Sequence, residues 1–569
     1  MAGRILLGVQ RKEAMSKKIA FPWVLMAISC GVFAQTVPSA GSQLHQIPVT
    51  PVPDSALPRI ELKPVGPLTS AEPAGTKITV RQLRIHGAQL YSEGDLIALT
   101  GFRPGSELTL NELRSMAVRI ADHYHRNGYF AAQAYLPAQN ILNGAVAIEV
   151  MEGRYGRIVL NNQTNVSDGL ANGLLGGLAG GDLIASAPLE NRLLLLSDLP
   201  GVTVRSTLAP GSTVGTSDLN VDLMPGQRVS GSIDADNAGN RYTGEYRLGA
   251  TINLNEPTGR GDVATLRMLT TGTGLNYARA AYQLQFGKAR AGVAYSALGY
   301  KLGQEFESLD ATGTAKVASV FGSYPVMRSR KQNMYVGLNF DAKTFQDKVD
   351  TTGFVADKSA DVWTASVNGD MTDTMGAGGL TAYSLAWSSG TVDLQTASMR
   401  ANDALSAQTA GHFDKLGFSL LRLQRVNNSL SVYASLSGQL ASKNLDASEK
   451  MGLGGMYAVR AYPQGEAEAD QGYLLTLEAR LQLPKFSENM AGQMQLIGFV
   501  DSGTVSLHKT PWAIGPNSRT LSGAGVGLSW ADTNSFAVKI YYARKLGTES
   551  ATSAPDTAGR FWIPAVKYF

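Results

Sequence analysis

The sequence predicts a mainly β chain in which two small α+β units precede a 16-stranded transmembrane antiparallel β-barrel. Three observations predict this class. Apolar and polar residues alternate repeatedly over residues 228–569, and two preceding runs of about 70 residues share one order of strands and helices. The chain also has 62 glycines, where average usage gives roughly 40. A surplus of glycine weakens helices and supplies turns, as a large β structure requires.

The overall composition excludes several other classes. With 44% hydrophobic residues the chain is too apolar for intrinsic disorder, and its single cysteine cannot support a disulfide framework. The formal net charge of +4 is too close to zero to indicate a nucleic-acid partner.

The N-terminus has the pattern of a secretory signal peptide. Lys17 and Lys18 precede an apolar run at residues 19–33, so we expect residues 1–34 to be removed after Ala34, with Met15 as an alternative start. A lipoprotein signal at Cys30 is the rival, but residues 27–29 fit it poorly. Removal leaves a chain without cysteine, which suits an oxidising compartment. No later segment has the 18 continuous apolar residues of a membrane helix.

Residues 35–76 are predicted to be an extended linker or N-terminal extension. Prolines recur throughout this segment, and such a composition disfavours helices and sheets alike. They are Pro38, Pro48, Pro51, Pro53, Pro58, Pro64, Pro67 and Pro73.

The first α+β unit is predicted at residues 77–153. A strand at 78–85 and a short helix at 92–99 precede a longer helix, which begins at the capping box of Thr109 and Glu112 and ends at Gly128. Strands at 129–136 and 145–150 complete the order β-α-α-β-β.

The second unit, at residues 154–227, repeats this order. A strand at 158–160 is followed by helices at 168–175 and 186–196, and then by a hairpin of strands at 202–208 and 219–223. The two units therefore form a tandem pair.

The C-terminal region, residues 228–569, is predicted to form the barrel. Its clearest strand, at 473–483, sets Tyr and Leu residues against Thr476, Glu478, Arg480 and Gln482. The strands of a soluble β-sandwich also alternate apolar and polar residues, but the alternating runs here reach about ten residues, which is longer than the usual sandwich strand. Sixteen strands would use about 21 residues each with their connections. The polar residues would face a wet interior.

Several short motifs resemble one family, the two-partner secretion transporters of the haemolysin activation and secretion type. The motifs that resemble its first POTRA domain are Gly128-Tyr129-Phe130, Ala134-Tyr135-Leu136-Pro137, Gln139, Gly144 and Glu152-Gly153. Those that resemble its second POTRA domain and first barrel hairpin are Leu199-Pro200-Gly201-Val202, Leu208, Pro210-Gly211, Asp236-Asn237-Ala238-Gly239, Thr243-Gly244 and residues 259–262. The resemblance covers residues 76–569.

The most diagnostic family motif is a loop that folds back into the barrel. In this sequence, the residues that resemble this loop are Gly454-Gly455 followed by Val459-Arg460-Ala461-Tyr462, with Ala461 in place of the usual glycine. The replacement argues against a positive φ at this position. A second motif is matched by Phe499-Val500-Asp501-Ser502-Gly503. The resemblance implies that Arg460 pairs with Asp501 and that the loop gates the lumen.

Two features depart from the family pattern. Members often carry an N-terminal helix that plugs the barrel, whereas the prolines of residues 35–76 argue against a long helix. Members also end in a signal read by the barrel assembly machinery, here Phe569, but Lys567 interrupts its alternation of apolar residues.

The resemblance implies an outer-membrane pore with POTRA domains in the periplasm. Its partners would be a large secreted exoprotein of the β-helical adhesin or haemolysin type, the barrel assembly machinery and outer-membrane lipid. The alternative function is a barrel assembly or insertion factor. A nutrient porin would not need tandem POTRA domains, and a secreted adhesin would not need detergent.

No motif indicates an enzyme, a cofactor or a metal site. G-x-S-x-G, Walker and CxxC motifs are absent from the sequence. His123 and His125 lie two residues apart on a predicted helix and point to different faces, unlike metalloprotease ligands. The glycine-rich residues 176–181 lack the lysine of a phosphate loop, and we interpret them as a connection.

Overall fold

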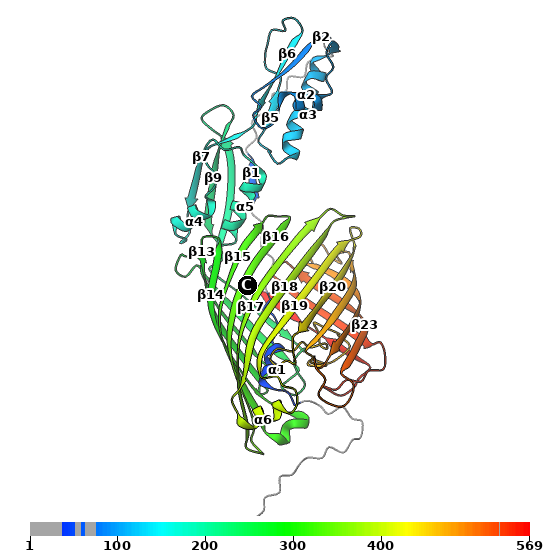
Figure 1. Cartoon of the computed structure of the whole chain (residues 1–569). Helices are drawn as coiled ribbons and strands as arrows, with labels where there is room; N and C mark the ends of the chain where they lie inside the picture. Colours follow the sequence, from blue (N-terminus) through cyan, green and yellow to red (C-terminus); the bar gives the residue numbers. More distant parts are fainter. Residues whose placement is uncertain (1–36, 52–58, 63–75, 534) are drawn as a thin grey trace, which may run out of the picture. The chain divides into compact units, whose positions relative to one another are not determined.

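The computed structural model describes residues 37–51, 59–62, 76–533 and 535–569, with the backbone alone at 59–62 (Figure 1). The predicted signal peptide lies outside these ranges. Most of the described chain is β-strand. No helix in the described ranges is long and apolar enough to cross a membrane.

The prediction that residues 35–76 hold neither helix nor strand is wrong at two places. Helix α1 spans Ala40–His45, and strand β1 spans Arg59–Leu62. The helix starts at a capping box in which the Ser39 and Ser42 side chains bond each other's backbone N–H groups. Prolines flank both elements without interrupting them, so they limit each element's length and do not prevent it from forming.

The first α+β unit has the predicted order with two additional strands, because the first predicted strand is divided and β4 lies between the two helices. Its elements are β2 Ile78–Val80, β3 Gln82–His86, α2 Glu93–Thr100, β4 Ser106–Leu108, α3 Leu110–Arg126, β5 Gln133–Tyr135 and β6 Ala145–Met151. Strand β6 pairs in parallel with β3 and antiparallel with β5. The predicted strand at 78–85 is in fact two strands, because β2 leaves the main sheet to pair with β4.

The capping box that starts α3 is confirmed. The Thr109 hydroxyl accepts a bond from the Glu112 N–H at 3.2 Å, and the Glu112 carboxylate accepts one from the Thr109 N–H at 2.7 Å. Near the end of the helix, the Tyr124 hydroxyl donates to Glu152 at 3.0 Å. Glu152 also accepts the N–H groups of Gln89 and Leu90. One buried carboxylate therefore joins the helix, a loop and the end of β6.

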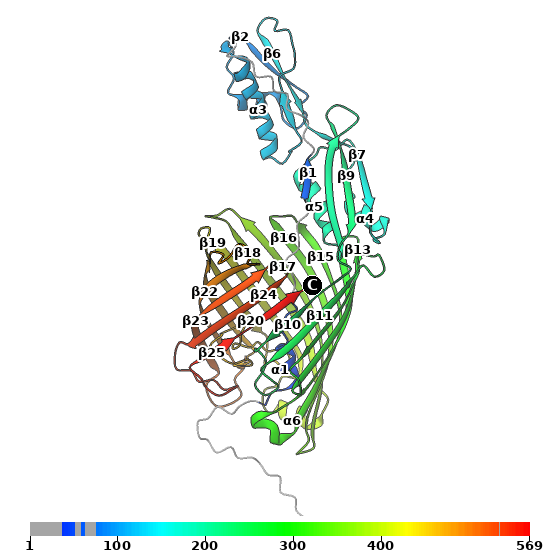
Figure 2. The same ribbon diagram turned by 180° about the vertical axis from the view of Figure 1, so that it is seen from behind.

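The second unit also has the predicted order. Its elements are β7 Arg154–Asn162, α4 Asp168–Leu175, α5 Ser186–Ser197, β8 Val202–Pro210 and β9 Thr216–Pro225. The sheet order is β1-β8-β9-β7, so the N-terminal strand β1 forms one edge of this sheet (Figure 2). Buried leucines of α4, α5, β8 and β9 form the core between the helices and the sheet.

Residues 229–568 form a closed antiparallel barrel of sixteen strands, as predicted. Strand β10 pairs with β11 on one side and with β26 on the other. Strands β25 and β26 both pair with β24 and are two halves of the sixteenth strand, interrupted at Pro564, which has no N–H to donate. The first eight strands are β10 Val229–Asp236, β11 Arg247–Asn255, β12 Val263–Thr270, β13 Leu275–Phe286, β14 Ala289–Lys301, β15 Ala311–Arg328, β16 Gln332–Val349 and β17 Phe354–Asp373. The others are β18 Gly379–Leu394, β19 Gly411–Arg425, β20 Leu430–Ala441, β21 Gln471–Gln482, β22 Gln493–Ser506, β23 Ser518–Asp532, β24 Phe536–Lys545, β25 Gly559–Trp562 and β26 Ala565–Tyr568.

Strand length differs from the prediction of about ten residues. Strand β17 has 20 residues and β16 has 18, so part of the wall extends beyond what is needed to cross a membrane. The longest connection, residues 442–470, lies at the barrel end opposite the first residue of β10. Connections at the same end carry the 3-10 helix η1 Gln304–Leu309 and helix α6 Ala397–Ala404.

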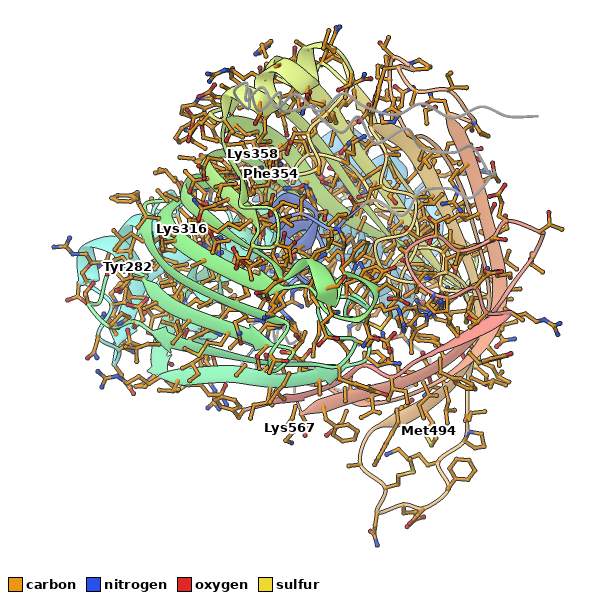
Figure 3. All side chains as sticks on the ribbon, turned by 90° about the horizontal axis from the view of Figure 1, so that it is seen from below. Tyr282, Lys316, Phe354, Lys358, Met494 and Lys567 are labelled. Carbon is orange, nitrogen blue, oxygen red and sulfur yellow. The ribbon has the colours of Figure 1, made fainter. Side chains whose placement is uncertain are left out.

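The prediction of a wet interior is only partly right. Apolar residues of the strands, of α1 and of the connection between β20 and β21 pack together inside the barrel in two clusters. In Figure 3 helix α1 lies within the ring of strands, next to β14, β15 and β16. The prolines argue against a long helix and hence against a plug; the helix inside the barrel is indeed short, with six residues, but it does lie in the lumen.

Candidate functional site

The connection between β20 and β21, residues 442–470, folds back into the barrel and carries the predicted loop motif. We call it the inward loop. It is held together by backbone bridges between Met451 and Ala469 and between Gly454 and Val459. Its side chains pack against wall residues from β22 to β25. The loop residues in this core are Leu453, Met456, Val459, Ala461, Tyr462, Ala467 and Ala469.

Arg460, at the centre of this loop, bonds directly to Asp501 of β22. Its Nε and Nη2 atoms donate to the two carboxylate oxygens at 2.8 Å each, and its backbone N–H donates at 3.2 Å. Arg460 is 4% exposed and Asp501 fully buried. A bidentate pair of this kind fixes both the position and the orientation of the loop.

A second carboxylate, Glu478 of β21, balances the charge of the cluster that contains Arg460, Asp501 and Arg480. It accepts Arg460 Nη1 at 2.8 Å through one oxygen and Arg480 Nε at 2.8 Å through the other. Sequence reasoning placed Glu478 among the inward polar residues of its strand but gave it no role. Every inward-facing residue of β21 has the same place in the alternation of apolar and polar residues, so only the structure distinguishes Glu478 from the others.

Aromatic side chains enclose the Arg460 guanidinium group. Its central carbon lies 3.5 Å from the centre of the Phe499 ring and 5.1 Å from that of Tyr541. The Trp562 indole N–H donates to the Arg460 carbonyl oxygen at 2.7 Å. The guanidinium group is thus removed from water and held by rings as well as by carboxylates.

The other predicted residues of the motif lie around this centre. The Val459 N–H donates to the Leu453 carbonyl, and the Tyr462 hydroxyl donates to the Glu549 carbonyl at 3.0 Å. Ala461 does not have a positive φ, which agrees with the substitution of glycine at this position. Three nearby residues of the inward loop do have a positive φ, namely Gly455, Gly465 and Ala467.

Glycines let the loop approach the wall closely. A Cβ atom on Gly503 would lie 2.4 Å from the Leu453 Cδ1 atom, and one on Gly454 would lie 2.5 Å from the Glu466 Cβ atom. Gly523 of β23, which sequence reasoning missed, faces the Ala461 methyl group, with 2.5 Å between the two Cβ positions. At Gly503 and Gly523 a side chain would push the loop from the wall, whereas at Gly454 it would separate two parts of the loop itself.

A second anchor holds the loop at Glu466. This buried carboxylate pairs with Arg519 of β23 and accepts the N–H groups of Thr552 and Ser553 at 2.8 Å. Burial opposes ionisation of Glu466, but these hydrogen bonds and the Arg519 charge outweigh it and hold the pKa of the carboxyl below its usual range.

Lysines of the wall pair with further acids of the loop. Lys358 of β17 bonds Asp446 at 2.8 Å, while Lys343 and Lys415 bond Glu449 at 2.6 and 2.9 Å. Burial favours the neutral acid, but the two lysines lower the pKa of Glu449 to about 2. Figure 3 shows Lys358 on the wall beside α1. The inward loop is thereby attached to strands on both sides of the barrel.

Helix α1 is bonded to both the wall and the inward loop. The Ala40 N–H donates to Asp347 of β16 at 2.8 Å, and the Thr243 hydroxyl donates to the Gln43 side chain at 2.7 Å. The His45 imidazole bonds the Ser448 carbonyl of the loop. Gly41 is required there, because a Cβ atom would lie 2.9 Å from Ser448. Helix and loop therefore fill the lumen jointly.

A cavity of about 450 Å³ remains beside this assembly. Arg460, Glu478, Arg480 and Lys539 contribute charge to its lining. Asp234 and Asp236 add negative charge, and apolar residues such as Met456, Leu474 and Val566 also line it. The hydroxyl-bearing residues of the lining are Tyr433, Ser435, Ser437, Tyr457, Thr476, Tyr541 and Tyr568. The lining thus mixes charged, hydroxyl-bearing and apolar side chains.

The predicted assembly signal, Phe569, lies at the seam between the first and last strands. Its backbone exchanges two hydrogen bonds with Gly231 of β10, at 2.9 and 3.1 Å. Phe569 is 48% exposed, and Phe561 and Ile563 are also exposed. Lys567 donates to the Ser535 hydroxyl at 2.9 Å, and Figure 3 shows it on the outside of the barrel.

The two histidines of α3 have ordinary partners. His125 bonds the Ala132 carbonyl at 2.8 Å, and His123 packs edge-on against Tyr91. Within the described ranges, no group of three His, Cys, Asp or Glu side chains is arranged to hold a metal ion.

Comparison with known proteins follows the same division of the chain. The model of the haemolysin secretion/activation proteins ShlB/FhaC/HecB matches residues 215–530, and the ShlB-type POTRA model matches residues 78–153. The heme/hemopexin transporter protein HuxB of Haemophilus influenzae is 28% identical over 571 residues, which cover 98% of this chain and 99% of HuxB. The outer membrane transporter CdiB of Dickeya dadantii is 23% identical, covering 80% of this chain and 81% of CdiB.

Solved structures share the fold. CdiB from Escherichia coli aligns with a TM-score of 0.65 and 19% identity over 89% of this chain and 93% of CdiB. BamA from Haemophilus ducreyi, lacking POTRA domains 1–3, aligns with a TM-score of 0.53 and 14% identity over 86% of this chain and 100% of that chain. At these identities the likeness is one of fold alone.

Fold and site together define the class of protein, an outer-membrane β-barrel transporter with POTRA domains. Within that class, the chain belongs to the haemolysin secretion/activation family, whose model matches more than half of it. The family resemblance is thereby confirmed. The chain is an outer-membrane secretion transporter of the two-partner type and not an enzyme.

Proposed function

We propose that this transporter carries one large exoprotein through its barrel lumen as an extended chain, and that the inward loop gates the passage. The observation that carries the proposal is the anchoring of Arg460 to Asp501 and Glu478, which holds the loop across the lumen. Such an anchor is specific in geometry and can be released as a unit. Client folding at the cell surface would drive export, because the periplasm lacks ATP.

The POTRA units would capture the client before it enters the barrel. Each unit contains a small sheet, and strands β3 and β5 form the outer edges of the first one. An edge strand can bind an extended peptide through main-chain hydrogen bonds, largely independent of its sequence. Deleting residues 78–152 or 156–223, with barrel insertion confirmed, should abolish secretion. Secretion at the level of the intact chain would reduce the units to spacers.

The client would be a large β-helical exoprotein of the adhesin or haemolysin type. Similarity to a heme/hemopexin transporter extends over nearly the whole of both chains, so a client that serves haem or hemopexin uptake is the first to test. Its gene should lie next to the gene of the transporter. Co-expression of the pair should place the exoprotein outside the cell, and its retention in the periplasm would contradict the pairing.

Two further partners follow from the outer surface of the barrel. Exposed apolar side chains such as Leu475, Leu477 and Val500 alternate with the buried Glu478 and Asp501, so lipid would cover the outer face. The barrel assembly machinery would read the C-terminal strand that ends at Phe569. Removing Phe569 should reduce barrel insertion, whereas Lys567→Leu, which restores the apolar alternation, should not.

The alternative function, insertion of other barrels into the membrane, makes a different prediction about the client. An assembly factor would leave its client embedded in the outer membrane. The likeness to BamA is one of fold and does not favour this alternative over secretion. Fractionation of the exoprotein between medium and membrane distinguishes the two functions.

A further inference from the structure

The outer face of the barrel has a hollow where the last strand meets the first. Its volume is about 400 Å³, and β10, β24 and β26 border it together with Trp530 of β23. Its lining is apolar except for Asp234 and Lys567. The Asp234 carboxylate is buried and paired with Arg267, whereas Lys567 is exposed and lies on the outside of the barrel (Figure 3). The charge available at this hollow is therefore that of Lys567.

The pairing of the strands explains why the wall is hollow at this place. Ala565 of β26 lies between Val538 of β24 and Ala235 of β10. Two of the three side chains in this row are single methyl groups, so the floor of the hollow is low. In the next row the side chains are larger, and Lys567 is the central one. The hollow therefore lies directly beside the lysine.

The Lys567 side chain has one hydrogen-bond partner and no acidic partner within the part of the chain that the structure describes. Its ammonium group donates to the Ser535 hydroxyl at 2.9 Å. Phe536 and Ile233 flank it in the strand register. Asp532, the acid of the same row, lies beyond Phe536 and forms no ion pair with Lys567. Because an ammonium group has three donors, Lys567 retains the capacity to bind an anion.

Lys567 lies near the barrel end that adjoins the POTRA units in the sequence. It is opposite Ile233, close to the start of β10, which follows the second POTRA unit. The Trp530 ring packs edge-on against Phe536, with 4.7 Å between the ring centres, and its N–H donates to the Ala491 carbonyl at 2.9 Å. Tryptophan and lysine side chains of this kind are typical of the membrane–water interface, where their polar ends stay wet. The hollow therefore opens at the periplasmic side of the membrane.

A phospholipid matches both parts of this site. An acyl chain that fits the hollow beside Ala565 gains contacts that a smooth wall does not offer. The phosphate would accept a hydrogen bond from Lys567, and a bond between two charged groups is stronger than one between neutral groups. A lysine on the lipid-facing side of a barrel is destabilising when it is unpaired, and the phosphate would offset that effect.

We propose that this hollow binds one phospholipid of the periplasmic leaflet, with its phosphate on Lys567 and an acyl chain on the floor between β24 and β10. The inference rests on the proposed contact of the outer face with lipid, and it adds a position and a head-group contact. It also gives a role to Lys567, the residue that interrupts the apolar alternation of the last strand.

A lipid bound at this place would strengthen the closure of the barrel. Strand β26 pairs with β10 through four residue pairs and with β24 through three, whereas β16 and β17 share 18. The end of the last strand is thus held by short ladders. Because a ligand that binds only the folded state stabilises that state, the phospholipid should raise the temperature at which the barrel unfolds.

Native mass spectrometry of the full chain in detergent, titrated with phosphatidylglycerol, measures binding at this site. The native chain should bind the first molecule at least about fivefold more tightly than Lys567→Gln does, since one lysine near a membrane surface contributes a factor of this size. Lys331→Gln is the matched control, because Lys331 is an exposed lysine in the turn between β15 and β16 and does not line the hollow. Equal affinities of the native chain and Lys567→Gln would overturn the proposal.

Filling the hollow tests the place of the acyl chain and leaves the charge untouched. Ala565→Phe puts a ring on the floor, so this variant should bind phosphatidylglycerol at least about fivefold more weakly than the native chain. Ala278→Phe adds the same ring at an exposed position of β13 and should bind as the native chain does. Dioleoylglycerol, which lacks the phosphate, and glycerol 3-phosphate, which lacks the chains, should not displace phosphatidylglycerol. Displacement by either compound would overturn a site that needs both parts of a phospholipid.

Heating separates this inference from the proposed lipid contact of the whole outer face. Phosphatidylglycerol should raise the unfolding temperature of the native chain in detergent more than that of Lys567→Gln, and both chains should insert into phosphatidylglycerol vesicles. An equal rise in the two chains would overturn the site at Lys567 while leaving the general contact with lipid intact. Failure of the native chain to insert into the vesicles would instead contradict the proposed lipid contact.

Discussion

The Arg460 guanidinium carbon lies 3.5 Å from the centre of the Phe499 ring, while the same side chain bonds Asp501 through two nitrogens. Stacking and ion pairing therefore act on one group. Because Arg460 is on the inward loop and both partners are on β22, the loop cannot leave the lumen without breaking both interactions.

Replacing Phe499 by leucine should loosen this attachment. The substitution removes the ring face, worth about 1–2 kcal/mol for a desolvated cation–π contact, and leaves a small cavity. We expect the variant barrel to unfold at a lower temperature than the native barrel when both are heated in detergent. Phe561→Leu is the matched control, since that ring is exposed on the outside. An equal shift for both variants would contradict a special role for Phe499.

The two carboxylates around Arg460 should contribute unequally. Asp501 accepts three bonds from Arg460, whereas Glu478 accepts one and is also bonded to Arg480. Asp501→Asn should therefore raise single-channel conductance more than Glu478→Gln. In a double-mutant cycle, Asp501→Asn should add little once Arg460→Ala is present. Additive effects would show that the two residues do not act together.

Adding a methyl group at Gly523 should displace the inward loop. The new Cβ atom would lie 2.5 Å from the Ala461 Cβ atom, with no other atom closer than 3.3 Å. Overpacking of this kind costs about 1–3 kcal/mol, and here the loop must yield. We expect Gly523→Ala to increase channel opening. Gly498→Ala, where nothing lies within 4 Å, should leave conductance unchanged.

Much of this architecture could be predicted from the sequence, but parts of the site could not. Alternation predicted a barrel, because lipid-facing and lumen-facing residues must alternate along each strand, and the length of the region was compatible with sixteen strands. The pairing of Arg460 with Asp501 came from a resemblance to family motifs. Glu478 and Gly523 carry no local signal that sets them apart from other inward residues.

Helix α1 and strand β1 were missed for a different reason. The proline content of residues 35–76 predicts no regular structure there, whereas prolines constrain only their own positions and immediate neighbours. Both elements are short and are stabilised by partners hundreds of residues or a whole domain away, such as Asp347 for α1 and β8 for β1. Such long-range partners leave no trace in the local sequence.

The stability of the barrel should depend on pH through Glu256, in the turn between β11 and β12. Its side chain is buried, one oxygen has no partner in the described part of the chain, and burial raises its pKa to about 7. Between pH 4.5 and 7 the folded chain keeps a proton that the unfolded chain loses. The stabilisation present below pH 4.5 is therefore lost as the pH rises through 7.

Glu256→Gln, which cannot ionise, should remove this dependence. At pH 8 we expect the variant to be more stable than the native chain by about 3 kcal/mol, and at pH 4 equally stable. Urea unfolding in detergent at the two pH values measures the difference. Glu488→Gln is the control, because that side chain is exposed. A stabilisation of equal size at both pH values would exclude ionisation of Glu256 as the cause.

The most direct measurement compares Arg460→Ala and Asp501→Ala in planar-bilayer conductance and in exoprotein secretion. Breaking a buried pair costs about 3–5 kcal/mol. Removing Arg460 leaves Asp501 without its partner, and removing Asp501 leaves Arg460 held by Glu478 alone, so either change should release the inward loop. We predict that both variants insert normally, conduct more than the native chain and fail to secrete the exoprotein. Native conductance together with native secretion in both variants would contradict the gate.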